Sequence, residues 1–303
     1  MSKEMFSPPA TDATGGPRRP AGAAVDVSYL SVPPAGLGAG TPVAVRVLGD
    51  QASVGRDLAE AIRAEILGAG SVGRGATLII PVGPVDQFPL LAAMINSERL
   101  DCRRTVFINM DEYLDDDGSY IPLGHPLSFR AYMDRHFYDL LDPGLAPPPQ
   151  NRVFPDPHRP DDIARLIGAR GGVDACFGGI GINGHIAFNE PPEPGETVTV
   201  EDFASLPTRV LPLSRETRTI NSVTVGGEIS IIPRLAVTVG LAECLGARRL
   251  RLYCNRPWQA AVVRRVLHGP ITPACPASLM RLHSDATLSI ADYVAKIPEI
   301  MLR

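Results

Sequence analysis

Long hydrophobic runs are missing from this sequence. No apolar stretch approaches the roughly 18 consecutive residues that a transmembrane helix needs, and the opening residues MSKEMFSPPA lack the apolar core of a signal peptide. We therefore expect no targeting segment, no membrane partner and a cytoplasmic location.

Runs of basic side chains are missing as well. The 303 residues include 29 Lys and Arg and 33 Asp and Glu, which gives a formal net charge of −4, and no cluster marks a nucleic-acid track or a polybasic patch. This balance favours a small-molecule partner over nucleic acid.

Cysteine is sparse and irregularly placed. The chain has five cysteines, with neither a CxxC pair nor the spacing of a metal site. We expect reduced thiols.

What is present is an alternation of strand and helix patterns after a start rich in Pro and Gly. Residues 1–25 lack periodicity and are expected to form a disordered arm, followed by one domain over 26–303. Apolar runs predict the strands, and apolar residues at helical spacing predict the helices. The strands are expected at 43–50, 76–83, 103–109, 173–181 and 248–254, and the helices at 51–67, 87–98, 126–141, 161–169, 233–245 and from Pro257.

This alternation predicts an α/β fold with an open, mostly parallel, twisted sheet and helices on both faces, as in Rossmann-like proteins. Ligands of such sheets bind at the carboxyl ends of the strands. Asp111 and Glu112 follow the strand expected at 103–109, and a carboxylate whose pKa is shifted by burial can act there as a general base. Because Asp is also common in turns, a turn-capping role for Asp111 is an equal alternative.

A second polar group lies in the stretch GGIGINGHIAFNEP at 178–191, which follows another expected strand. His185 can exchange protons near neutral pH, and Glu190 can orient it or balance its charge. A lone loop His is more often structural, but two such groups at one sheet edge favour a role in catalysis.

Several segments are similar to those of glucosamine-6-phosphate deaminases, within the sugar-phosphate isomerase and lactonase superfamily. They are NMDEYL (109–114), HP (125–126) with the helix after it, GIGINGHIAFNEP (179–191), LSRETRTINS (213–222), which resembles that family's lid, and IPRLAVTVGLAECLGARRLRL (232–252). The similarity extends from about residue 42 to 290, and GHIAFNEP is a highly specific string.

Such enzymes open the ring of an amino sugar, move a proton between C2 and C1, and release ammonia to give a ketose. The resemblance implies that Asp111 takes the C2 proton and that His185 and Glu190 open the ring. It implies no metal and no organic cofactor and, by analogy with relatives, a homo-oligomer. The residues expected to contact the substrate are Gly83, Asp86, Glu112, Gly184, Asn189, Arg215 and Arg256.

The sequence departs from the family where the phosphate would bind. The family's first phosphate loop carries Ser and Thr hydroxyls, whereas the stretch PVGPVDQF at 81–88 has Pro84 and Val85 there, with Asp86 beside them. We interpret Asp86 either as a group that faces C6 and favours a hydroxyl or an ammonium, or as the N-cap of a helix.

Two further phosphate contacts of the family are replaced. Val223 stands where the lid has an Arg, and the stretch NRPWQ at 255–259 offers only Arg256 in place of a Lys. Three changes at one subsite predict a sugar that lacks the 6-phosphate.

The motif also carries Asn183 where the family has an Asp that fixes the tautomer of the His and stabilises its protonated form. Ring opening is then weaker or arranged differently: the substrate needs little of it, Glu190 orients His185, or the reaction has changed. The leading interpretation is an isomerase or deaminase acting on an amino sugar. The alternatives are a catalytically inactive sugar-binding or regulatory homologue and a lactone hydrolase.

Overall fold

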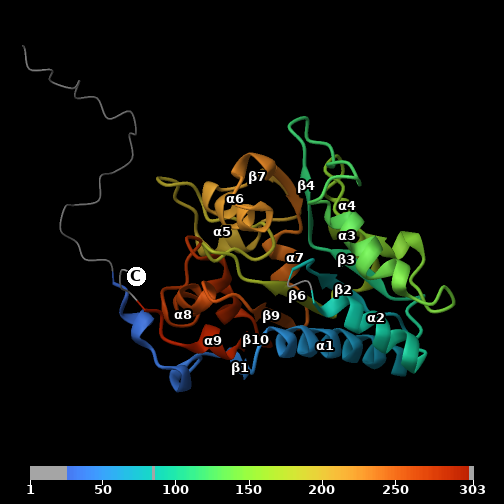
Figure 1. The fold of residues 1–303 in the computed structure, drawn as a ribbon, viewed down its shortest axis with the longest axis horizontal. Helices are drawn as coiled ribbons and strands as arrows, with labels where there is room; N and C mark the ends of the chain where they lie inside the picture. Colours follow the sequence, from blue (N-terminus) through green and yellow to red (C-terminus); the bar gives the residue numbers. More distant parts are fainter. Residues whose placement is uncertain (1–25, 84–85, 300–303) are drawn as a thin grey trace, which may run out of the picture.

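The core of the fold is a parallel sheet, seen in a computed structural model that describes residues 26–83 and 86–299 (Figure 1). The expected arm at 1–25, and Pro84 and Val85, lie outside the described residues. Within the described ranges, seven strands pair in parallel throughout. In spatial order they are β1 (Ala44–Leu48), β10 (Ala286–Ala291), β9 (Leu250–Cys254), β6 (Ala175–Gly179), β2 (Thr77–Ile80), β3 (Val106–Asn109) and β5 (Arg152–Val153).

The central strands are apolar on both faces, as a sheet covered by helices requires. Every residue of β2 (TLII) and β3 (VFIN) is buried. The prediction of an open, mostly parallel sheet is confirmed, and the expected strands match β1, β2, β3, β6 and β9 to within a few residues.

Helices connect the strands in two opposite directions across the sheet. From β1 the chain passes to β2 and β3, whereas from β6 it passes to β9 and β10 on the other side. Since crossovers between parallel strands are right-handed, the two sets of helices cover opposite faces. The helices are α1 (Gln51–Ser71), α2 (Gln87–Glu98), α3 (Phe129–His136), α4 (Asp162–Arg170), α5 (Val200–Ala204), α6 (Arg215–Ser222), α7 (Leu241–Leu245), α8 (Gln259–His268) and α9 (Asp292–Ala295).

The connections from β2 and from β6 lead to opposite sides of the sheet, so the direction in which the chain advances across the sheet reverses between these two neighbouring strands. This is the switch point at which open α/β sheets form a crevice beyond the strand ends. None of the helices in the described part of the chain is both long and apolar enough to span a bilayer.

A smaller antiparallel sheet lies over the carboxyl ends of the main strands, with α6 beside it (Figure 1). It consists of β4 (Asp111–Leu114), β8 (Leu235–Thr238) and β7 (Arg209–Pro212) in that order. Its side chains form a second apolar cluster around Tyr113 and Phe188.

The helix expected at 233–245 is therefore wrong in its first half. The run LAVT of β8 pairs with a strand on each side, and only Leu241–Leu245 is helical. β-branched residues favour the extended form when such partners exist, and tertiary pairing overrides the helical spacing.

Arg264 is the largest fully buried side chain described and ties three segments together. Its guanidinium donates hydrogen bonds to the carbonyl oxygens of Val32 at 2.9 Å, Ala260 at 3.0 Å and Ala295 at 2.6 Å. It thus links the segment before β1, helix α8 and helix α9.

We predict that Arg264→Met lowers the free energy of unfolding, because it leaves the carbonyls of Val32 and Ala295 without a hydrogen-bond donor. Each unsatisfied carbonyl is expected to cost roughly 1–3 kcal/mol. Urea unfolding measures the change. Arg265→Met, which removes a single hydrogen bond to Ala274, is the matched control and is expected to cost about 1 kcal/mol or less. Equal losses in the two variants would contradict the linking role of Arg264.

Candidate active site

A cleft of about 230 Å³ opens at the switch point of the main sheet. It lies between the carboxyl ends of β2, β6 and β9 and the junction of β3 with β4. Its lining is mixed, with apolar walls and a few polar groups. The lining residues are Pro81, Val82, Gly83, Met110, Asp111, Phe129, Gly179, Ile180, Gly181, His185, Ala187, Phe188, Asn221, Tyr253, Asn255, Arg256 and Gln259.

Asp111 is the first residue of β4 and lines this cleft. Only 7% of it is exposed, and burial, with the nearby Glu112 carboxylate, raises its pKa to about 8. Its carboxylate makes no hydrogen bond to any described residue, so the turn-capping alternative finds no support. The group is suited to exchanging a proton near neutral pH.

Two glycines shape the loop that carries His185. A Cβ at Gly181 would lie 2.1 Å from Cε1 of His185, so the imidazole occupies space that only glycine leaves open. Gly184 has φ +92°, and a Cβ there would lie 2.7 Å from Sγ of Cys275. Gly184 therefore allows the turn and a close contact, and it is not among the cleft-lining residues, contrary to the expected substrate contact.

Asn183 holds His185 and Glu190 at once. Its Oδ1 lies 2.9 Å from Nδ1 of His185, and its Nδ2 donates to Oε2 of Glu190 at 2.6 Å. Because an amide oxygen only accepts, Nδ1 of a neutral His185 carries the proton and Nε2 has the free lone pair. Asn183 thus fixes the tautomer that an Asp would fix, without the charge.

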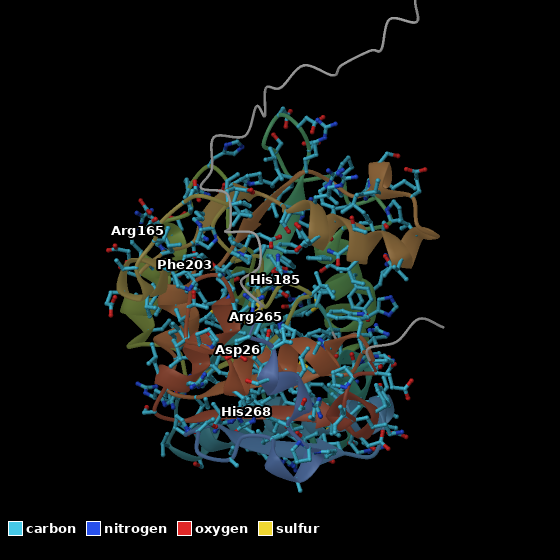
Figure 2. The ribbon with its side chains drawn as sticks, turned by 90° about the vertical axis from the view of Figure 1, so that its left-hand side faces the viewer. Asp26, Arg165, His185, Phe203, Arg265 and His268 are labelled. Atoms are coloured by element: carbon cyan, nitrogen blue, oxygen red, sulfur yellow. The ribbon has the colours of Figure 1, made fainter. Side chains whose placement is uncertain are left out.

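The charge near His185 comes from Glu190, whose Oε2 lies 3.5 Å from Nδ1. Figure 2 shows His185 close to the centre of the molecule, above Arg265 of α8. Burial on its own would raise the pKa of Glu190, but hydrogen bonds from His185, Asn183 and Thr217 and the charge of His185 outweigh it and lower the pKa to about 2. Glu190 is therefore ionised at neutral pH.

The start of helix α6 completes this network. The backbone N–H of Ser214, its N-cap, donates to Oε1 of Glu190 at 3.2 Å, and the Ser214 hydroxyl accepts from Asn183 at 3.2 Å. Fully buried Thr217 places Oγ1 3.2 Å from Nδ1 of His185. The segment that resembles the family's lid is thus hydrogen-bonded to Asn183, Glu190 and His185.

Glu112 and Asn189 do not line the cleft, although both were expected to contact the substrate. The fully buried Glu112 carboxylate accepts hydrogen bonds at the start of α3, among them the backbone N–H groups of Phe129 at 3.0 Å and Arg130 at 2.9 Å. The Asn189 amide donates to backbone carbonyls and its oxygen accepts from Arg209 at 2.7 Å. Both residues hold the walls of the site in place.

Asp86 and Arg215 also lie outside the cleft lining, whereas Gly83 and Arg256 are part of it. Oδ2 of Asp86 accepts a hydrogen bond from Nε2 of Gln51 at 2.6 Å. Asp86 occupies the N-cap position of α2 but makes no capping hydrogen bond there. The N-cap interpretation of Asp86 therefore finds no support, and the interpretation that it faces C6 stays a prediction.

The sequence patterns missed Asn221, Asn255 and Gln259 as cleft residues. Asn255 follows β9 directly, and a polar residue after a buried parallel strand is a signal that was available. Among the residues that the structure describes, no cluster of three or more His, Cys, Asp or Glu side chains could hold a metal ion.

Comparison with known proteins gives the ancestry of the chain. No family model matches the sequence. It is 30% identical to the glucosamine-6-phosphate deaminase of Streptomyces avermitilis over 262 residues, which are 83% of this chain and 91% of that protein. The chain belongs to the glucosamine-6-phosphate deaminase family. The deaminase of Bacillus pumilus is 32% identical over 216 residues, 68% of this chain and 80% of the relative.

Solved structures agree with this membership. A glucosamine-6-phosphate deaminase described as monomeric matches with a TM-score of 0.71 at 25% identity, covering 84% of this chain and 100% of its own. The 6-phosphogluconolactonase of Thermotoga maritima shares the fold alone. It matches with a TM-score of 0.59 at 14% identity and covers 82% of this chain and 100% of its own. Since the family includes a monomer, the homo-oligomer stays a prediction.

We predict that Thr217→Val raises the pKa of Glu190, because the carboxylate loses a hydrogen-bond donor, whereas Thr217→Ser keeps it near 2. The wild-type hydrogen bonds stabilise the fold above the unfolded pKa, and this stabilisation is lost as the pH falls towards 2. The loss of stability in Thr217→Val should thus be larger at neutral pH than at acidic pH. Carbon-13 NMR of the carboxylate measures the titration, and an unchanged pKa in Thr217→Val would refute the contact.

Proposed function

We propose that this protein is an isomerase or deaminase that transfers a proton between C1 and C2 of an amino sugar lacking a 6-phosphate. The observation that carries the proposal is that Asp111 and His185 line one cleft and that Asn183 and Glu190 bind His185 from behind. At neutral pH the Asp111 carboxyl group is mostly protonated and the Glu190 carboxyl group is ionised. Pairs of carboxyl groups whose pKa values are pushed apart provide a base and a charge stabiliser at one site.

The base in this mechanism is Asp111. Once the sugar ring is open, its carboxylate removes the proton from C2 and leaves an enolamine between C1 and C2. Returning the proton to C1 gives an imine at C2, where water adds and ammonia leaves to form the ketose. Only molecules in which Asp111 is ionised can begin this sequence.

Ring opening falls to His185. With the proton on Nδ1, its Nε2 can take the proton of the sugar's anomeric hydroxyl, and the resulting imidazolium is stabilised by Glu190 at 3.5 Å. As the bond between C1 and the ring oxygen breaks, the imidazolium gives this proton to the ring oxygen, which leaves an aldehyde at C1. Asn183 orients the ring through Oδ1 and keeps a second negative charge away from Glu190. This arrangement supports ring opening without the Asp of the family motif.

The proposal that the substrate lacks a 6-phosphate is supported by the residues at the positions of the family's phosphate site. Pro84, Val85 and Val223 replace groups that would bind a dianion, and the structure describes Val223 as exposed outside the cleft lining. Arg256 is the only Lys or Arg among the described residues that line the cleft. A single cation supports a substrate of lower charge than a phosphate ester.

We predict that Asp111→Asn lowers kcat by about 10²–10⁴-fold, because the amide cannot accept the C2 proton. The Asp111→Asn variant should still bind the sugar, as measured by calorimetry. The control is Asp116→Asn, which alters an exposed residue just beyond β4 and should convert the sugar at the normal rate. Full activity of Asp111→Asn would refute the mechanism, and wild-type protein that binds amino sugars without converting any would identify an inactive binding protein.

The pH dependence offers a separate check. Since Asp111 must be ionised to act and burial raises its pKa to about 8, kcat/KM should rise from about pH 6 to about pH 9 with a midpoint near 8. Turnover of glucosamine measured by ammonia release gives the profile. A rate that is flat across this range would exclude Asp111 as the base.

A further inference from the structure

We propose that the end of the cleft formed by Asn255 and Arg256 binds a carboxylate, so that the substrates are amino sugar acids of the hexosaminuronate class. The inference rests on the proposed function, which it extends from the reacting carbons to the far end of the sugar. It replaces the 6-amino sugar that Asp86 suggested, since that carboxylate lies outside the cleft lining and is bound by Gln51.

The first observation is the side-chain amide of Asn255. It is 95% buried, lines the cleft, and makes no hydrogen bond to any residue in the described ranges; its Nδ2 is buried without an acceptor. An unpaired buried amide costs roughly 1–3 kcal/mol, so nearly all such groups in folded proteins bind another protein group or an ordered water. Because Asn255 lines a cleft, we assign the missing partner of its amide to a ligand bound at this end.

The second observation is that the main chain beneath this amide is fixed from two sides. The backbone carbonyl of Asn255 accepts a hydrogen bond from the Tyr293 hydroxyl at 2.6 Å, and the backbone N–H of Arg256 donates to Oε1 of Gln259 at 2.8 Å. Nε2 of Gln259 in turn donates to the carbonyl of Ile180 at 2.7 Å. These hydrogen bonds hold the turn in place. The two side chains that it presents to the cleft, buried Asn255 and exposed Arg256, make no hydrogen bond with the described residues.

The third observation is the sign of the charge. The Arg256 guanidinium has no ion pair or hydrogen bond with the described residues, and helix α8 begins three residues later with no acidic residue in its first turn. Both contribute positive potential. Helix α2, the other helix that begins near the cleft, already has Asp86 at its N-cap position.

One guanidinium and one amide suit a planar monoanion. A guanidinium matches the two oxygens of a carboxylate with two parallel hydrogen bonds, and an amide can donate to a lone pair that remains. A hydroxymethyl group would leave the cation without a counter-charge, and a phosphate dianion would find none of the hydroxyl groups that its family site uses. The subsite therefore favours a carboxylate over both.

The position of the subsite fits the reaction. In the sheet, β9 is separated by β6 and β2 from β3, which leads into Asp111. Three strand spacings place the main chains of the two ends roughly 14 Å apart. This span accommodates a hexose with C1 and C2 at Asp111 and its C6 group at Arg256.

The test compares 2-amino-2-deoxyglucuronate, glucosamine and glucosamine 6-phosphate as substrates of the full chain, with calorimetric binding measured beside ammonia release. We expect the uronate to have at least a tenfold higher kcat/KM than either other sugar. Arg256→Gln and Asn255→Leu should each raise KM for the uronate by about 10–100-fold and reduce its advantage over glucosamine. Arg135→Gln, a change of an exposed arginine outside the cleft lining, should leave the preference unaltered.

The outcomes separate the two proposals. If glucosamine is converted as well as the uronate, or if Arg256→Gln leaves the preference intact, the carboxylate subsite is refuted while the proposed reaction stands. If the uronate binds in an Arg256-dependent manner but no sugar is converted, the subsite stands and the reaction is refuted. A preference for glucosamine 6-phosphate refutes the carboxylate subsite and the exclusion of the phosphate together.

Discussion

The placement of the active site depends on Met110, the residue at which the chain leaves the parallel sheet for the antiparallel one. Its backbone N–H donates to Ile80 of β2 at 2.9 Å, and its carbonyl accepts from Val239, just after β8, at 2.8 Å. One residue thus joins the two sheets. Asp111 follows immediately, so its depth in the cleft is set by hydrogen bonds to both layers.

Two largely buried carboxyl groups, one lining the cleft and one behind His185, are kept in different protonation states by their different surroundings. Asp111 has burial and a neighbouring carboxylate but no donor among the described residues, so its proton is retained until about pH 8. Glu190 is also buried, yet it receives donors from the His185 loop and from α6. The difference arises from hydrogen bonding rather than from exposure.

Much of the fold follows from local patterns, because the buried strands of a parallel sheet are continuous apolar runs. Strand β8 could not be recognised in this way, since its four residues acquire their conformation from β4 and β7. The positions of Asp111, His185 and Glu190 after expected strands already marked them as candidates, and the likeness to deaminases implied a role for each. In the structure Asp111 and His185 line one cleft, and Glu190 lies 3.5 Å from His185. Their exact functions remain predictions.

The expected substrate contacts that lie outside the cleft lining share a different cause. Glu112 and Asn189 stand next to or near cleft residues in the sequence, but a strand turns neighbouring side chains to opposite faces, and loop side chains bind whatever backbone groups they meet. Conversely, the importance of Asn255 is a missing hydrogen bond, which no spacing of residues reveals. Which polar groups are satisfied becomes known only from the three-dimensional arrangement.

Helix α9 contacts both the turn at Asn255 and the buried Arg264. Its Tyr293 holds the carbonyl of Asn255, and the carbonyl of its last residue, Ala295, is held by Arg264 of α8. The far wall of the cleft is therefore supported from behind by a short element late in the chain. Substitutions at 292–295 would shift that wall and alter which sugars fit. Asp111, His185 and Glu190 would keep their own contacts.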